Sequence, residues 1–222
     1  MPLAALQAHE IVAGALVRYS SAGGGAAGRH PPTAVLVHGV LGSRRNMRSF
    51  AQQLVEGFPS WQVLLVDLRC HGDSAAAPPG GPHGVQSAAG DVLRLLSALK
   101  LFPEMLVGHS FGGKVVMSMA HQFGSGTKRL PRPVRVWVLD ALPGEVRSGE
   151  MGGQDRPADL ITCLRRTPLP LPSRSALVAD LERQGFSSPV AMWASTNLVP
   201  HAGDPSRLVW SFDLDGIAEM YR

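Results

Sequence analysis

Short runs of apolar residues recur along the chain and predict buried β-strands. The runs lie at residues 10–19, 33–37, 63–66, 105–107 and 134–139. Strands without alternating polar positions are typical of a parallel sheet that helices cover on both faces. Between the runs, apolar residues recur at helical spacing, for example over 50–55 and 92–99. This alternation of strands and helices predicts a mostly parallel, doubly wound α/β sheet.

The pattern changes after residue 140, where prolines separate short segments whose apolar residues recur at helical spacing. These segments lie at 160–164, 177–181 and 190–193. We therefore expect a helical cap inserted into the sheet, followed by an extended segment over 208–212. The predicted division is an α/β core over 1–141, a helical cap over 142–200 and a return segment to the core over 201–222.

The composition supports one folded domain rather than a nucleic-acid-binding or disordered chain. The chain has 222 residues, of which 45% are hydrophobic and 17% charged, enough to bury a core and form a deep pocket. Its net charge of +4 comes from scattered Lys and Arg residues, without a long basic run. We expect a small-molecule substrate and no nucleic-acid partner.

The two cysteines, Cys70 and Cys163, are far apart and lack the spacing of a zinc motif or a disulfide framework. We expect two buried free thiols, a reducing compartment, and neither a metal nor a cofactor. The first residues lack a basic segment and reach Glu10 early, and no apolar stretch is long enough to span a membrane. These features predict a soluble intracellular protein, in the cytoplasm or else in a chloroplast or mitochondrion.

The strongest chemical signal is Gly-His-Ser-Phe-Gly at 108–112, which follows an apolar run and precedes a helix-like segment. A serine flanked by glycines between a strand and a helix is typical of a nucleophile elbow, in which the sharp turn exposes the serine oxygen. The N–H groups that begin the following helix favour developing negative charge. The pattern predicts that Ser110 is a nucleophile.

A second signal is the turn that begins at His38, directly after the 33–37 run. Enzymes of this architecture place an oxyanion donor at that point. We expect the backbone N–H groups of Val40 and Phe111 to form the oxyanion hole, with Leu41 as a substitute for Val40. His38 is expected to brace the loop rather than transfer protons.

The segment Asp67 to Ser74 brings two aspartates and a histidine close together in sequence. This grouping has two interpretations, a metal site and a hydrogen-bonded turn. The spacing lacks the ligand geometry of a helix or hairpin site, so we expect the turn.

Four strings occur in order along the chain, VLVHGVLGS, VLLVDLRCHGDS, VGHSFGGK and VWVLDALPG. With these strings the chain resembles the α/β-hydrolase domain-containing protein 11 family, especially its plant-type members. The resemblance continues through residues 193–198 and 209–215. It implies an esterase or thioesterase-like serine hydrolase without a cofactor and with a helical cap over the pocket.

A catalytic serine needs a general base, and an acid holds that base in the correct orientation. The resemblance implies that the acid lies within 210–216, so Asp215 is the candidate, with Asp140 as the runner-up. It also implies a histidine in a later Gly-His-Trp turn, with which nothing in this chain aligns. We therefore expect a C-terminally truncated chain whose last strands and closing helix are missing.

The function predicted from these features is cleavage of short to medium acyl esters through an acyl-enzyme at Ser110. One alternative is a catalytically impaired product without the general-base histidine. Another is a lyase of the menaquinone-pathway type, which would use Ser110 as a base. Five apolar cap residues are expected either to form an acyl-binding wall or to be ordinary cap core. They are Leu160, Leu164, Phe186, Met192 and Trp193.

Overall fold

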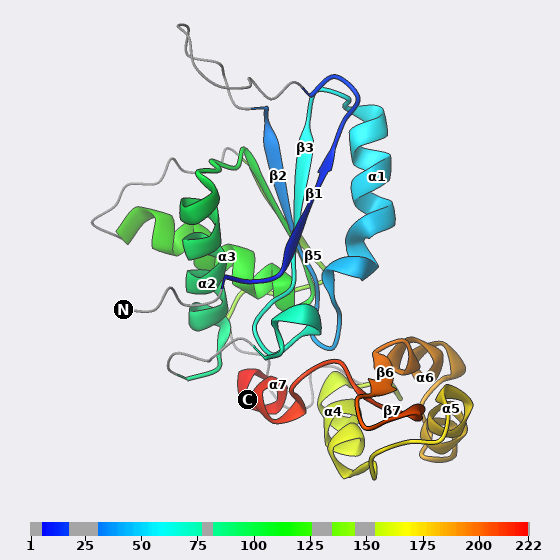
Figure 1. Ribbon diagram of the computed structural model, residues 1–222. Coiled ribbons are helices and arrows are strands. Elements are labelled where there is room, and N and C mark those ends of the chain that lie inside the picture. Colours follow the sequence, from blue (N-terminus) through cyan, green and yellow to red (C-terminus); the bar gives the residue numbers. More distant parts are fainter. Residues whose placement is uncertain (1–5, 18–30, 77–81, 126–134, 145–153, 222) are drawn as a thin grey trace, which may run out of the picture.

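A computed structural model describes five stretches of the chain, at residues 6–17, 31–76, 82–125, 135–144 and 154–221. A twisted sheet flanked by helices forms the larger part (Figure 1). A smaller group of helices and a hairpin lies below one end of this sheet in the same view.

The sheet confirms the predicted fold class. It has five described strands, β1 (His9–Ala13), β2 (Thr33–Val37), β3 (Gln62–Val66), β4 (Met105–His109) and β5 (Arg135–Leu139). Their order is β1-β3-β2-β4-β5, with β1 antiparallel to β3 and the other neighbours parallel. Parallel strands bring their carboxyl ends to one edge, where ligands bind in open α/β sheets.

Helices cover both faces of the sheet. Helix α1 (Arg48–Gly57) lies on one face, and α2 (Val85–Leu99) and α3 (Phe111–Ser125) lie on the other (Figure 1). Successive residues of a strand point to opposite faces. In β3, Val63 and Leu65 accordingly join the cluster that includes Ala51 of α1, whereas Leu64 and Val66 join the cluster under α2 and α3. This two-sided burial explains why the strands are uniformly apolar.

The cap contains the three expected helices and a hairpin that the sequence pattern did not predict as a whole. Its elements are α4 (Pro157–Arg166), α5 (Arg174–Arg183), α6 (Ser188–Ser195), β6 (Leu198–His201) and β7 (Asp204–Trp210). Strands β6 and β7 are antiparallel, and together they cross the predicted boundary between residues 200 and 201. A further helix, α7 (Leu214–Met220), packs against α4.

The cap and the sheet share one apolar core. Buried side chains of the cap, including Leu164 and Leu177, belong to the same cluster as Leu106 of β4 and Val115 of α3. The cap is therefore packed as part of the domain rather than as a separate unit.

Strand β5 is paired only with β4 among the described strands. Its Trp137 is 52% exposed, and Val136 and Leu139 are also exposed. Among the described residues, the outer edge of the sheet at β5 therefore carries exposed apolar side chains.

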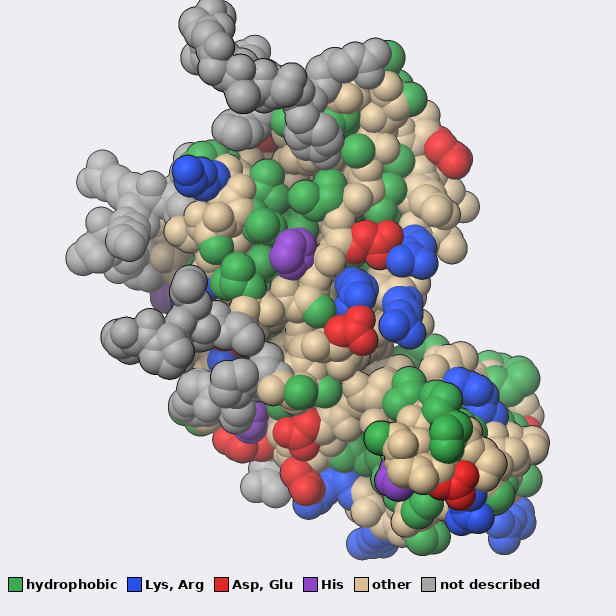
Figure 2. All heavy atoms as spheres, viewed as in Figure 1, with side chains coloured by type: hydrophobic (Ala, Val, Ile, Leu, Met, Phe, Trp, Pro, Cys, Tyr) green, Lys and Arg blue, Asp and Glu red, His purple; other side chains and the backbone are tan. Residues whose placement is uncertain are grey.

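Charged side chains of both signs lie next to one another on the face shown in Figure 2. No broad area of one sign covers the described part of this face. No helix in the described part of the chain is long and apolar enough to cross a membrane.

A buried ion pair joins the loop after β3 to α2. Arg69 is 5% exposed and Asp91 is 3% exposed. The guanidinium donates two hydrogen bonds to the carboxylate, from Nε to Oδ2 at 2.6 Å and from Nη2 to Oδ1 at 2.8 Å. This paired geometry compensates both groups for their loss of water.

Replacing Asp91 by Asn should destabilise the fold, because the buried Arg69 charge then keeps only carbonyl oxygens as partners and has no counter-charge. We expect a loss of about 3–5 kcal/mol in the free energy of unfolding, measured in urea. The control is Asp159→Asn, which removes the exposed pair with Arg156 and should cost less than about 1 kcal/mol. Equal losses in the free energy of unfolding for the two variants would show that the buried pair contributes no more to stability than the exposed pair.

Candidate active site

Ser110 occupies the turn between β4 and α3 in a strained backbone conformation. Its φ is 52°, in the left-handed region that residues other than glycine rarely adopt. Its N–H donates to the carbonyl of Leu139 at 2.8 Å, and its carbonyl accepts from the N–H of Gly113 at 2.8 Å. These hydrogen bonds hold the turn, and the serine is half-buried. Such strain at a single residue is typical of functional sites.

The glycines beside Ser110 are required by close backbone contacts. A Cβ at Gly108 would lie 2.7 Å from the Gly113 nitrogen, and a Cβ at Gly112 would lie 2.5 Å from the His38 carbonyl oxygen. No side chain fits at either position. The tight turn at Ser110 therefore requires glycine at both positions.

The loop after β2 lies directly against the serine. A Cβ at Gly39 would lie 3.2 Å from the Cβ of Ser110, so the two backbones approach closely there. Among the described residues, none accepts a hydrogen bond from the N–H of Val40. Phe111 begins α3, and the first N–H groups of a helix have no partner within it. The assignment of Val40 and Phe111 as oxyanion donors stays a prediction.

Two side chains hold the backbone of Leu41, one at its N–H and one at its carbonyl. Its N–H donates to Nε2 of His71 at 3.1 Å, and its carbonyl accepts from Nδ2 of Asn197 in the cap at 3.0 Å. Because this N–H already has an acceptor, Leu41 does not offer a free oxyanion donor, which leaves Val40 as the candidate in this loop.

Two buried histidines brace the loop. His38 donates from Nδ1 to the Gly39 carbonyl at 2.8 Å, since its Nε2 accepts from the N–H of Leu68 at 3.0 Å. His71 is held in the same tautomer, with Nδ1 donating to the Arg69 carbonyl at 2.8 Å. Burial lowers the pKa of both rings, and that of His71 falls to about 3. The prediction that His38 braces the loop is confirmed.

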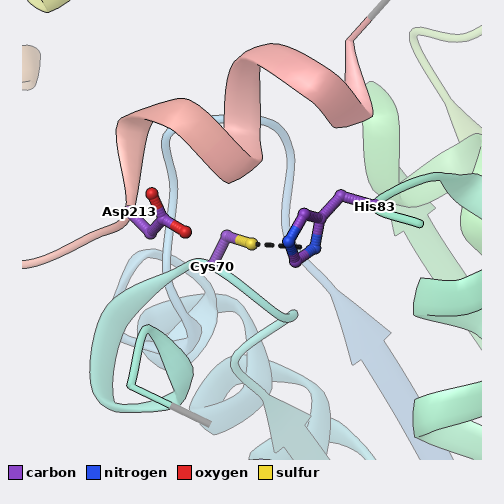
Figure 3. A group of neighbouring side chains, drawn as sticks. All are labelled: Cys70, His83 and Asp213. Atoms are coloured by element: carbon purple, nitrogen blue, oxygen red, sulfur yellow. Dashed lines mark hydrogen bonds between the residues drawn. The ribbon is translucent and has the colours of Figure 1, made fainter. Parts of the chain in front are cut away.

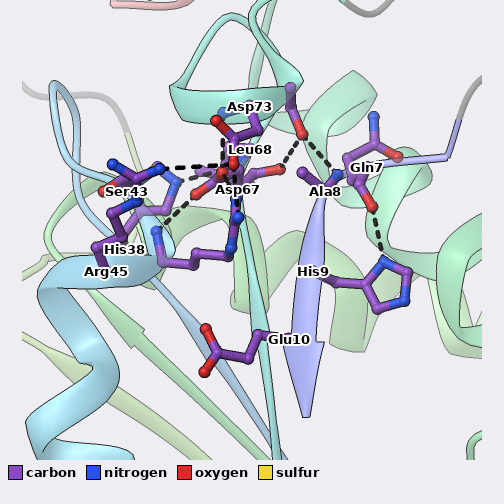
Figure 4. Close-up of polar contacts among 12 residues, drawn as sticks. Gln7, Ala8, His9, Glu10, His38, Ser43, Arg45, Asp67, Leu68 and Asp73 are labelled. Atoms are coloured by element: carbon purple, nitrogen blue, oxygen red, sulfur yellow. Dashed lines mark hydrogen bonds and ion pairs between the residues drawn. The ribbon is translucent and has the colours of Figure 1, made fainter. Parts of the chain in front are cut away.

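Asp67 anchors the turn that follows β3 (Figure 4). Its buried carboxylate accepts from the backbone N–H of Arg44 at 2.6 Å and of Asp73 at 3.0 Å, and it pairs with the Arg44 guanidinium. The hydroxyl of Ser74 donates to the Asp67 carbonyl at 3.0 Å. The hydrogen-bonded turn expected for this segment is therefore present.

The two candidate acids lie in different surroundings. Asp215 is in the first turn of α7, its side chain is 82% exposed, and it accepts hydrogen bonds from Arg165 at 2.6 and 2.9 Å. Asp140 directly follows Leu139, whose carbonyl holds the N–H of Ser110. The role of Asp215 as the acid stays a prediction.

Among the described residues, no side chain forms a hydrogen bond with Ser110 Oγ. The described histidines after it are His121 on α3 and His201 on β6. His201 faces Asp204 across the cap hairpin. The described contacts therefore assign no general base.

Three of the five apolar cap residues are ordinary core. Leu160, Leu164 and Phe186 are buried in the shared cluster. Trp193 is partly buried against that cluster, and Met192 is 55% exposed. The structure therefore favours cap core over an acyl wall for the three buried residues.

Two residues that hold the loop after β2 were not predicted from the sequence to be part of the site. His71 and Asn197 both lie within strings that carried the family resemblance. Nothing in their spacing shows that they meet at Leu41, since that contact depends on the packing of the cap onto the core. Both cysteines are buried and free, as predicted.

The chain belongs to the alpha/beta hydrolase fold family, whose model matches residues 32–167. Its likeness to the α/β-hydrolase domain-containing protein 11 group is also confirmed. The chain is 31% identical over 193 residues to the mouse (Mus musculus) sn-1-specific diacylglycerol lipase ABHD11, covering 85% of this chain and 57% of that protein. The Xenopus tropicalis protein of the same name is 37% identical over 91 residues, covering 41% of this chain and 27% of that protein. The chain thus spans little more than half of the mouse relative.

A shorter match is to 2-succinyl-6-hydroxy-2,4-cyclohexadiene-1-carboxylate synthase of Klebsiella pneumoniae, 32% identical over 99 residues, with 45% of this chain and 36% of that protein covered. Among solved structures, a marine microorganism esterase matches with a TM-score of 0.70 and 21% identity, covering 96% of this chain and 70% of that one. At this identity the structural match supports the fold alone.

The buried histidines predict loss of stability in acid. A lowered pKa in the folded state means that the unfolded chain binds more protons between about pH 3 and pH 6.5. Stability should therefore be highest above pH 6.5 and should fall, as the pH decreases through that window, by up to about 1.4 kcal/mol per pH unit from His71, with a further loss from His38.

This pH dependence is measured by urea unfolding at several pH values. The variant His71→Gln should be less stable at pH 7 and should show a slope smaller by about 1.4 kcal/mol per pH unit. An unchanged slope in this variant would contradict the assignment.

Proposed function

We propose that this chain carries the catalytic serine of a carboxylesterase or thioesterase-like hydrolase that cleaves short to medium acyl esters. The observation that supports this most strongly is Ser110, held at a positive φ between β4 and α3 with its flanking glycines in close backbone contact. This is the geometry of a nucleophile elbow.

In the proposed reaction, Ser110 Oγ attacks the acyl carbonyl and forms a tetrahedral intermediate, whose oxyanion accepts hydrogen bonds from Val40 and Phe111 N–H. Expulsion of the alcohol or thiol leaves an acyl-enzyme, which water then hydrolyses. A histidine would take the Ser110 proton, and Asp215 or Asp140 would orient that histidine. Backbone donors need no titration, so the oxyanion site would be ready before substrate binds.

Likeness to a protein named as a diacylglycerol lipase supports an ester substrate for the whole protein. The match to the synthase of Klebsiella pneumoniae covers less than half of this chain, and no contact of Ser110 favours the lyase alternative. The proposal therefore keeps the acyl-enzyme route.

The first test is covalent labelling with a fluorophosphonate probe, followed by turnover of p-nitrophenyl esters. The wild-type chain should be labelled and should release p-nitrophenol, whereas Ser110→Ala should not be labelled and should lose at least about 1,000-fold in kcat/KM. Asp215→Asn and Asp140→Asn in the same assay decide between the two acids. An unlabelled wild-type chain that unfolds cooperatively would contradict the proposal and support the impaired product.

Asn197 should act as a positioning residue. Replacing it by Ala removes the donor to the Leu41 carbonyl and loosens the loop beside Ser110. We expect kcat for p-nitrophenyl butyrate to fall by about 10- to 100-fold while KM changes much less.

The neighbouring variant Thr196→Val is the control, because the Thr196 hydroxyl donates within its own turn, to the Trp193 carbonyl at 2.6 Å, and has no other hydrogen bond among the described residues. It should retain the wild-type kcat. A loss in KM alone, or an equal loss in both variants, would show that Asn197 does not position the loop.

A further inference from the structure

Three side chains of the kinds that bind metals converge beside α7. They are Cys70 on the loop after β3, His83 just before α2 and Asp213 at the start of α7 (Figure 3). Their ligand atoms all lie within 4.8 Å of one another. Among the described residues, this is the one group of three or more His, Cys, Asp or Glu side chains placed closely enough to hold a metal ion.

The separation of sulfur and nitrogen suits a tetrahedral metal. Cys70 Sγ lies 3.4 Å from His83 Nδ1. Zinc bonds of about 2.3 Å to sulfur and 2.0 Å to nitrogen place these two ligands about 3.5 Å apart at a tetrahedral angle. The carboxylate of Asp213 lies on the other side of the sulfur (Figure 3), and one of its oxygens lies within 4.8 Å of both the sulfur and a ring nitrogen of His83.

The backbone around the group is already fixed by long-range contacts. The N–H of Asp213 donates to the Cys70 carbonyl at 2.8 Å, and the N–H of His83 donates to Glu219 Oε1 at 3.0 Å. The loop that carries Cys70 is therefore held at Asp213, which caps α7, and the segment that carries His83 is held at Glu219 within α7. Because these contacts need no metal, they lower the entropic cost of bringing the three ligands together.

One carboxylate oxygen is available to a cation. Asp213 Oδ1 accepts both capping hydrogen bonds of α7, from the N–H groups of Asp215 and Gly216, each at 3.1 Å. Among the described residues, Oδ2 receives no hydrogen bond. A Cβ at residue 216 would lie 2.7 Å from Oδ2 and would overlap Cys70 Sγ, so glycine there leaves the space between the ligands open.

Chemistry at the thiol itself is a weaker alternative. Burial raises the pKa of Cys70 to about 12, so it is a protonated thiol at neutral pH rather than a nucleophile. Asp213 and His83 lie on either side of the sulfur, which is not the serial order of a nucleophile, a base and an orienting acid.

We propose that Cys70, His83 and Asp213 form a zinc site that fastens α7 to the core. One thiolate, one imidazole and one carboxylate match the ligands that zinc prefers, and a water would take the fourth position. On binding, the S–H bond of Cys70 breaks, its proton passes to solvent, and the thiolate bonds to the metal. Among the described residues, none of the three ligands forms a hydrogen bond with Ser110, and the proposal does not rest on the proposed hydrolase activity.

The test uses the whole chain after removal of metals with a chelator. Zinc added in competition with a chromophoric chelator should bind with one equivalent per chain and raise the melting temperature. Cobalt should give a thiolate-to-metal charge-transfer absorption. Cys70→Ser should abolish that absorption, and His83→Gln should weaken zinc binding by more than about 100-fold.

Asp213→Asn keeps an amide oxygen that can cap α7 but loses the charge, so it separates metal binding from folding. It should melt near the wild type without zinc and gain little from added zinc. Cys163→Ser is the matched control, because Cys163 is the other buried thiol and donates to Gln184 at 3.1 Å. It should bind zinc as the wild type does. Absence of zinc binding in the wild type, or undiminished binding in Cys70→Ser, would overturn the proposal.

Discussion

The close approach of α3 to the end of β2 is the contact on which the candidate site depends. Because the backbone at Gly112 lies against the His38 carbonyl, the helix begins directly beside the loop that follows β2. Ser110 is thereby forced into the left-handed region, and its side chain is placed where the two backbones meet. A bulkier residue at 112 would separate the helix from the strand and would move the serine and both predicted oxyanion donors at once.

Polar groups hold the loop in place because it is buried. His38 and His71 are neutral, each with one nitrogen donating and the other accepting, so that neither ring leaves a buried polar atom without a partner. These hydrogen bonds fix the orientation of the loop as well as its position, whereas apolar packing alone does not fix an orientation. Protonation of either ring would remove the acceptor nitrogen that holds a backbone N–H of this region.

The sequence predicted most of the core because its strands are short, apolar and followed by turns with a clear residue signature. The bounds expected for β2 match the structure, and β3 and β4 extend the expected runs by one or two residues. The turn at Ser110 could be predicted equally well, because Gly108 and Gly112 are required for a steric reason that is local in the sequence. Helix α7 was missed because it is only seven residues long and its stability depends on packing against α4. The meeting of Cys70 with Asp213, and that of Leu41 with Asn197, depends on how distant segments pack, and no local spacing encodes such contacts.

The hydrogen bond between Asn197 and the Leu41 carbonyl joins the cap to the loop that lies beside the serine. An outward swing of the cap must either break this bond or pull the loop with it. On the proposed assignment of Val40 as an oxyanion donor, such a movement would open the site and displace that donor in one event, so that an enzyme of this construction would be active only when closed. Substitutions that adapt the cap to a new substrate would alter the rate of the chemical step as well as the affinity.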